Sequence, residues 1–145
     1  MLLRYSQDFD DIAPPSYAHE GDVGFDIRAA VPEEGVLVYP NQVFDVPTGL
    51  RFDIPDGWEL QIRPRSGLSS QISILNSPGT VDSGYRGEIK VRIAARPSFI
   101  FRLKRGDRIA QAVLAPVYRA EFERVEDISS DTARGEGGFG STGVE

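Results

Sequence analysis

Short segments of alternating apolar and polar residues, separated by turn-forming residues, constrain the fold of this chain most strongly. Residues 58–63 and 89–94 alternate with a period of two, which places successive side chains on opposite faces of a β-strand. Glycine (15) and proline (10) are frequent and spread along the 145 residues, which disfavours long helices. The pattern predicts a set of short strands joined by turns.

Further strands are predicted on both sides of the Pro40-Asn41 turn and, more fully buried, over residues 109–117. Turn residues recur at positions 55–57, 77–79 and 104–107, and Pro78-Gly79 suits a type II turn. One short helix is expected near residues 66–70. Short strands at regular spacing predict a single all-β domain, either a sandwich or a barrel.

Composition excludes several kinds of catalytic site, metal site and partner. The chain contains no cysteine, which excludes disulfides, thiolate zinc sites and cysteine nucleophiles, and its one histidine, His19, disfavours a Ser-His-Asp triad or a multi-histidine metal site. A net charge of −6 disfavours nucleic acid as a partner. The first 15 residues do not resemble a signal peptide, and no apolar run reaches the ~20 residues of a membrane helix. We therefore expect a cytoplasmic protein with neither a membrane nor a nucleic-acid partner.

The C-terminal residues differ from the rest because apolar side chains nearly vanish from residue 129 onward. We expect one β domain over residues 1–128 and a flexible C-terminal segment over residues 129–145. Residues 134–143 hold five glycines and one aromatic side chain, Phe139. This segment is either a disordered tail or, with Arg134, main-chain N–H groups and the hydroxyls of Ser141 and Thr142, a cradle for phosphate.

Two internal segments contain the residue types of an anion or nucleotide site. In residues 63–68, two arginines flank a proline and precede Ser66 and Gly67, so guanidinium, hydroxyl and main-chain donors can meet phosphate. The alternative is an ordinary junction between a strand and a turn. In residues 76–89, two reversals can hold a hairpin pocket around Asp82 and Tyr85. The alternatives there are a turn carboxylate and a packing aromatic side chain.

Two further polar side chains stand inside strand patterns. Gln111 interrupts the apolar segment 109–117, where it either faces solvent or projects a donor into a site. Asp26 lies in the alternating segment 24–30, and the alternative to a functional role is a structural aspartate with a charged partner.

Taken in order, residues 24–30, 64–68, 79–89, 105–111 and 134–143 resemble the five motifs of trimeric dUTPases. Five motifs in the right order are far more specific than any one of them. The resemblance implies a distorted jelly-roll β-barrel that forms a homotrimer. Each active site is then built from three chains, and the C-terminal arm of one chain closes over it. The chain carries Gly84 where many members have a carboxylate, which bears on the flexibility of that turn.

The resemblance also implies an activity and a cofactor. The substrate would be dUTP, and Asp82 would be the general base that activates water for in-line attack on the α-phosphorus. Mg²⁺ would be held mainly by the substrate phosphates, with Asp26 acting through water. The products would be dUMP and pyrophosphate. Removal of dUTP would limit uracil incorporation into DNA, and the dUMP would supply dTMP synthesis.

Substrate contacts follow from the same resemblance. The main chain from residue 76 to 85 would read uracil, with binding residues Asn76, Gly79 and Val81, and Tyr85 would pack under the deoxyribose. The phosphates would be held by Arg65, Ser66, Gly67 and Gln111. From the arm, Arg134 would meet the γ-phosphate and Phe139 would stack on uracil. The remaining substrate-binding residues of the arm would be Gly138, Ser141 and Thr142.

Two other functions compete with this one. A dCTP deaminase, alone or bifunctional with dUTPase activity, shares the fold and a similar third motif. However, Arg92 stands at the position that we align with the catalytic glutamate of deaminases. A non-enzymatic β-sandwich binding module would explain the strands and the tail but would leave the polar motifs unconnected.

Overall fold

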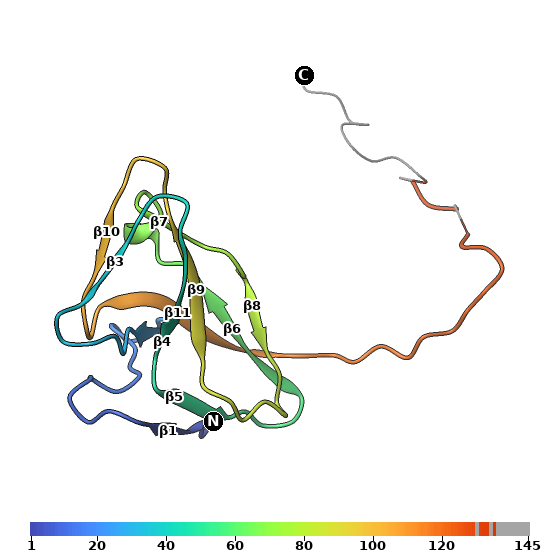
Figure 1. Cartoon of the computed structure of the whole chain (residues 1–145). Helices are drawn as coiled ribbons and strands as arrows, with labels where there is room; N and C mark the ends of the chain where they lie inside the picture. The colour runs from blue at the N-terminus through green and yellow to red at the C-terminus, as the bar shows by residue number, and fades with distance from the viewer. Residues whose placement is uncertain (130, 134, 136–145) are drawn as a thin grey trace.

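The computed structural model describes residues 1–129, 131–133 and 135 of the chain (Figure 1). The described part is built almost entirely from short strands, with one turn of 3-10 helix, η1. The elements in chain order are β1 (Arg4–Gln7), β2 (Phe25–Arg28), β3 (Val36–Val38), β4 (Val43–Pro47), β5 (Leu50–Asp53), β6 (Trp58–Arg63), η1 (Ser66–Leu68), β7 (Ile72–Ile74), β8 (Gly79–Val81), β9 (Lys90–Ala95), β10 (Phe101–Leu103) and β11 (Arg108–Pro116). The prediction of an all-β fold is confirmed.

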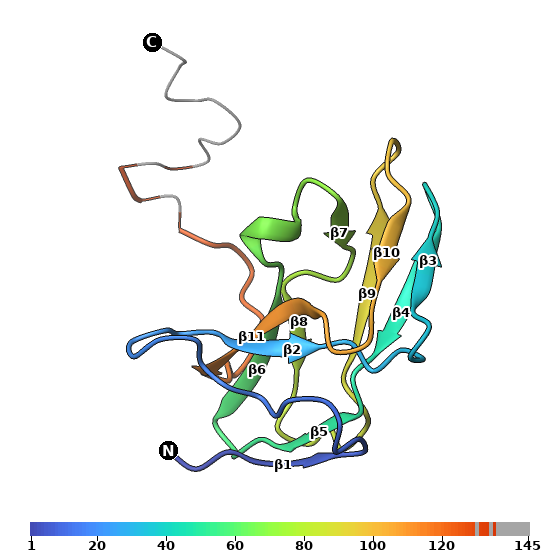
Figure 2. The same ribbon diagram turned by 90° about the vertical axis from the view of Figure 1, so that its left-hand side faces the viewer.

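The strands form four antiparallel sheets that wrap around one core, as the two views show (Figures 1 and 2). The orders are β1-β5, β10-β3, β2-β11-β6-β8 and β4-β9-β7. The strands predicted over residues 58–63 and 89–94 are β6 and β9, and the short helix predicted near residue 66 is η1. The strands on either side of Pro40-Asn41 do not pair with each other, because β3 pairs with β10 and β4 pairs with β9.

Strand β11 organises the four-stranded sheet because it pairs with β2 on one side and β6 on the other. Its register sets Gln111 opposite Asp26 of β2 and also opposite Arg63 of β6. Residues opposite each other in a ladder point to the same face. Three polar side chains from distant parts of the sequence therefore lie in one row across the sheet, with the apolar side chains of the same strands on the other face.

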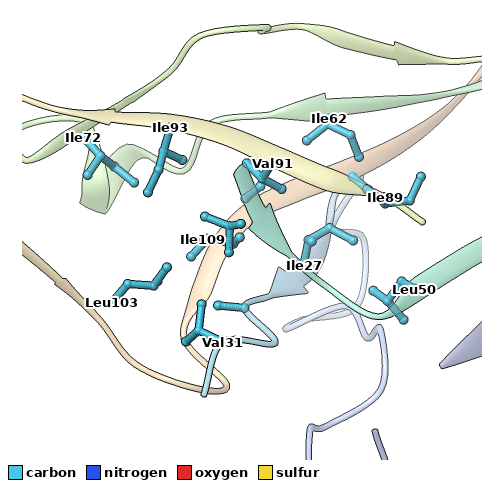
Figure 3. Packing of buried hydrophobic residues seen from close by; sticks show 14 of the residues in the cluster. Ile27, Val31, Leu50, Ile62, Ile72, Ile89, Val91, Ile93, Leu103 and Ile109 are labelled. Atoms are coloured by element: carbon cyan, nitrogen blue, oxygen red, sulfur yellow. The ribbon is translucent and has the colours of Figure 1, made fainter. Parts of the chain in front are cut away.

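The core lies between the sheets and consists mainly of branched aliphatic side chains that point toward one another (Figure 3). Ile27, Leu60, Ile93, Leu103 and Ile109 have no measurable exposure. The two-residue period of β9 buries Val91 and Ile93 and exposes the residues between them. Burial of this apolar surface is the main stabilising contribution to the barrel.

Thr48 is the buried polar residue of the described chain, and it joins two segments of the barrel. Its hydroxyl donates to the Ile89 carbonyl (2.6 Å) and accepts from the Leu50 N–H (3.1 Å).

Thr48→Val keeps the shape of the side chain but removes both hydrogen bonds, so we expect the free energy of unfolding to fall by about 2 kcal/mol. Urea denaturation at fixed protein concentration measures this change. The matched control is Thr80→Val on β8, an exposed position where a change within roughly 0.5 kcal/mol is expected. An equal effect of both substitutions would contradict the prediction.

After β11 the chain leaves the barrel. In both views residues 117–129 run outward from the end of β11 (Figures 1 and 2). The Val117 N–H still donates to the Gly57 carbonyl (2.9 Å), but farther on Tyr118 and Phe122 are each 97% exposed.

Within the described residues, no helix is long and apolar enough to cross a membrane.

Candidate functional site

A first cleft lies between β8 and the residues that lead into β9. It has a volume of about 400 Å³. All five predicted residues of this region line it, namely Asn76, Gly79, Val81, Asp82 and Tyr85. Four of its other lining residues, which the sequence analysis did not single out, are Ile62, Thr80, Glu88 and Lys90.

The backbone around this cleft differs from the predicted hairpin. β8 pairs with β6 whereas β9 pairs with β4 and β7, so the two strands belong to different sheets and diverge. The cleft is the space left by this divergence. The type II turn predicted at Pro78-Gly79 is also wrong, because Gly79 lacks the positive φ that its third position requires. Gly79 instead allows close packing, since an added Cβ would lie 2.8 Å from the Asn76 carbonyl oxygen.

The turn predicted at Ser83-Gly84 is present and carries the two principal side chains. The Tyr85 N–H donates to the Asp82 carbonyl (3.0 Å), which closes a turn over residues 82–85. The Tyr85 hydroxyl donates to the Glu88 carbonyl (3.0 Å), so the ring lies back over Gly87, where an added Cβ would overlap the hydroxyl. Asp82 and Tyr85 are thus held on one rim of the cleft.

Glu88 is a second carboxylate in the first cleft, but it has a structural partner. Its Oε1 accepts hydrogen bonds from the main-chain N–H groups of Thr48 (3.1 Å) and Gly49 (2.9 Å). These donors lie about 40 residues away in sequence. No local pattern predicts such a bond, which explains why the sequence analysis missed Glu88.

The second cleft, of about 360 Å³, lies over the row of polar residues on β2, β11 and β6. It is lined by the predicted residues Asp26, Arg65, Ser66, Gly67 and Gln111, together with Arg63. The Gln111 amide donates to the Pro64 carbonyl (2.9 Å). An added Cβ at Gly24 would lie 2.6 Å from the Gln111 amide oxygen, so glycine makes room for this side chain. Of the two alternatives for Gln111, the structure favours the one in which it projects into a site.

Arginine charge dominates the second cleft. Asp26 is only 13% exposed at its side chain, and its two oxygens contact Arg65 and Arg108, the latter at 3.3 Å. Burial, and then the positive charge of Arg108, lower the pKa of Arg65, but the group stays charged because an arginine pKa lies so far above neutrality. Arg63, Arg65 and Arg108 exceed the nearby carboxylates Asp22 and Asp26 in number. The cleft therefore favours an anion, and two guanidinium groups with a hydroxyl suit phosphate.

The described residues contain no group of three or more His, Asp or Glu side chains that could enclose a metal ion. Asp26 is the carboxylate that the sequence analysis assigned to Mg²⁺, and both of its oxygens already have arginine partners. This donor set suits contact with a hydrated ion through water better than direct ligation, because Mg²⁺ demands octahedral oxygen ligands and gives up water reluctantly.

The two clefts share no lining residue within the described chain. One chain therefore does not bring Asp82 and Tyr85 together with Arg65 and Gln111. Arg86, another arginine in the third motif, also lies apart from Arg63 and Arg65, since it contacts Asp53 of β5. The predicted arm residues Arg134, Gly138, Phe139, Ser141 and Thr142 lie outside the described residues.

Arg92 lines neither of the two clefts. Its guanidinium forms two hydrogen bonds with the Asp45 carboxylate of β4, at 2.7 and 2.8 Å, on the exposed face of the sheet. The pair lowers the pKa of Asp45 through the hydrogen bonds from Arg92. The position aligned with the deaminase glutamate is thus occupied by a paired surface arginine, which gives the deaminase alternative no support.

Comparison with known proteins shows similarity over most of the chain. The profile of the dUTPase family matches residues 10–143. A deoxyuridine 5'-triphosphate nucleotidohydrolase of Brucella melitensis is 52% identical over 133 residues, which cover 90% of this chain and 84% of that protein. The protein of the same name from Rhizobium etli is 53% identical over 133 residues, which cover 90% and 85% of the two chains.

Solved structures show the same similarity in three dimensions. A dUTPase of Staphylococcus bacteriophage 80alpha, determined with dUpNHpp, superposes with a TM-score of 0.86 at 27% identity. The superposition covers 99% of each chain. The superposition therefore spans every strand of the fold.

Proposed function

Since this chain belongs to the dUTPase family and hydrolyses dUTP, we propose that its two clefts hold the two halves of that substrate. The first cleft, with Asn76, Gly79 and Val81, receives uracil and deoxyribose. The second cleft, rich in arginine, receives the triphosphate. The observation that carries the proposal is the separation of a base-sized cleft beside Asp82 from an anion-binding cleft around Arg65.

The first cleft explains selectivity for uracil. The main chain of residues 79–81 is held by the pairing of β8 with β6, so a cytosine placed against it would leave buried donors and acceptors unpaired, which is a strong basis for rejection. Gly79 packs closely against the Asn76 carbonyl and so forms part of the cleft wall, and we propose that this wall excludes the 5-methyl group of thymine. Tyr85, seated over Gly87, packs against the deoxyribose and excludes a ribose 2′-hydroxyl.

Asp82 is the proposed general base. Its carboxylate orients one water molecule and accepts its proton as the water oxygen bonds to the α-phosphorus. The bond between the α-phosphorus and the bridging oxygen to the β-phosphate breaks, so the products are dUMP and pyrophosphate. Arg65, Ser66, Gly67 and Gln111 hold the phosphate oxygens so that the leaving group stays in line with the attacking water.

Mg²⁺ is the proposed cofactor. Bound by the substrate phosphates, it neutralises charge on the pyrophosphate leaving group. Asp26 would contact the hydrated ion through water, since Arg65 and Arg108 hold the carboxylate at the wall of the second cleft. The contacts among Arg65, Arg108 and Asp26 would thereby place two groups at the same wall of the cleft: the Arg65 guanidinium, which contacts phosphate, and the Asp26 carboxylate, which accepts a hydrogen bond from water.

A homotrimer with shared active sites is the proposed assembly. The separation of the two clefts on one chain supports it, because a complete site then requires a second copy. The segment after β11 also supports it. Tyr118, Phe122 and Ile128 are 97%, 97% and 78% exposed, and such apolar side chains suit contact with another chain. This segment leads to the arm residues Arg134, Gly138, Phe139, Ser141 and Thr142, which we propose close over the nucleotide.

Product analysis with each of the common deoxynucleoside triphosphates tests the proposed selectivity. With Mg²⁺ present, we expect dUTP to yield dUMP and pyrophosphate, while dCTP and dTTP react at least about 1000-fold more slowly because they leave polar groups unpaired or do not fit. Release of ammonia from dCTP would instead restore the deaminase alternative. Comparable pyrophosphate release from dTTP would contradict the proposed reading of uracil by the first cleft.

A further inference from the structure

The turn that carries Asp82 and Tyr85 has few restraints of its own. β8 lies at the edge of its sheet and pairs only with β6, through residues 79–81. Among the described main-chain hydrogen bonds, the one from Tyr85 to Asp82 closes the turn. Gly84 stands in its middle, with no atom within 4 Å of an added Cβ, and glycine increases backbone freedom. The position of Asp82 therefore depends on contacts from outside the turn.

Arg86 supplies such contacts with one planar guanidinium. Its Nη1 donates to the carbonyls of Ser83 (2.5 Å) and Tyr85 (3.1 Å). Its Nη2 donates to Oδ1 of Asp53 (2.9 Å). The fixed fork of donors on arginine suits simultaneous contact with several acceptors, which a lysine ammonium would not reproduce in the same geometry. The turn is thereby joined to β5.

Asp53 is a firm anchor for this contact because its backbone belongs to the barrel. It ends β5 and pairs with Arg4 of β1 in the ladder. Its neighbours Phe52 and Ile54 are buried, with 4% and 2% exposure. A guanidinium bound to Asp53 is therefore bound to a residue of the barrel. It adds a second tie to the turn, beside the hydrogen bond from the Tyr85 hydroxyl to the Glu88 carbonyl.

We propose that Arg86 and Asp53 form a latch that holds the 82–85 turn and so positions Asp82 and Tyr85 for dUTP hydrolysis. This inference rests on the proposed role of Asp82 as the general base. Arg86 and Asp53 are 59% and 51% exposed at their side chains, so water screens their attraction and the pair adds little to global stability. Its effect is geometric, because small displacements of a catalytic group cause large losses of rate. Arg86 is a positioning residue, since it contacts the turn and not the reacting atoms.

The test combines Arg86→Ala, Asp53→Asn and the double variant, with steady-state kinetics on dUTP and thermal unfolding. We expect each single substitution to lower kcat by about 10-fold or more while KM changes far less. The double variant should be no slower than Arg86→Ala, because both substitutions break the same contact. The matched control is Arg92→Ala, which removes an exposed arginine-aspartate pair between β9 and β4 that lines neither cleft. Arg86→Ala and Arg92→Ala should have similar Tm values, but only Arg86→Ala should lose kcat.

Three results would overturn the latch: a kcat for Arg86→Ala within about twofold of wild type, multiplicative losses in the double variant, or a Tm far below that of Arg92→Ala. Asp82→Asn measured in parallel separates the latch from the function on which it rests. If Asp82→Asn is inactive while Arg86→Ala is fully active, only the latch fails. If Asp82→Asn is fully active, the assignment of the base fails first.

Discussion

Asp82→Asn is expected to reduce kcat by about 1000-fold while leaving the fold intact and nucleotide bound, because a positioned general base contributes roughly 10²–10⁴ to rate. Asparagine keeps the size of the side chain and can still contact water, but it cannot accept the proton. Asp82 has no ion pair among the described side chains, so its replacement removes no salt bridge from the barrel. Single-turnover hydrolysis of dUTP and binding of a non-hydrolysable analogue measure the two parts of this prediction.

The matched control is Glu88→Gln in the same cleft. The Gln amide oxygen can still accept from Thr48 and Gly49, so we expect this variant to retain most of the activity. Equal losses in both variants would show that charge in the cleft, and not proton acceptance at Asp82, governs the rate. Wild-type turnover by Asp82→Asn would exclude the residue as the base.

Asp82→Asn also tests whether active sites are shared between chains. Asp82→Asn impairs the first cleft, and Arg65→Gln impairs the second, on which the triphosphate depends. In a mixed oligomer, the intact first cleft of an Arg65→Gln chain can meet the intact second cleft of an Asp82→Asn chain. Co-refolded mixtures should therefore regain activity that neither variant has alone. No recovery in verified mixed oligomers would place both clefts of a working site on one chain.

Truncation after Ala133 has the second large expected effect. Every strand and every core residue of the described chain precedes residue 118, so the shortened chain should fold and assemble normally. It loses Arg134, Phe139, Ser141 and Thr142, which we propose contact the bound nucleotide. We expect kcat/KM for dUTP to fall by about 100-fold or more, the scale on which removal of one preorganised charge-stabilising donor acts.

Circular dichroism and size measurement in solution give the control for truncation, since both should match the full-length protein. Arg134→Ala in the full-length chain distinguishes the effect of the guanidinium from that of the other arm residues. This variant should show part of the loss in kcat/KM for dUTP. Full activity of the truncated protein would exclude a closing arm. Loss of assembly would instead assign these residues a structural role.

The alternation of apolar and polar residues was enough to predict strands at β6 and β9, because period two is a local property of the backbone. The more continuous apolar segment 109–117 predicted β11. The resemblance carried by the five motifs predicted about half of the residues that line the two clefts. Local patterns failed at residues 76–89, where Pro78-Gly79 suggested a type II turn and a hairpin. The strands that flank this segment pair with different sheets, and the choice of partner strand depends on distant residues.

The residue types and their order along the chain therefore predicted the fold class. The resemblance of the five motifs to those of dUTPases gave Arg65 as a candidate phosphate contact and Asp82 as the candidate base. Tertiary structure alone decided that Gln111 stands between Asp26 and Arg63, that Glu88 is bound by Thr48 and Gly49, and that Arg86 contacts Asp53. It also placed Asp82 and Arg65 in different clefts of one chain. Strand periodicity is encoded by near neighbours, whereas ladder register and side-chain pairing are contacts between segments tens of residues apart, which only the packed barrel brings together.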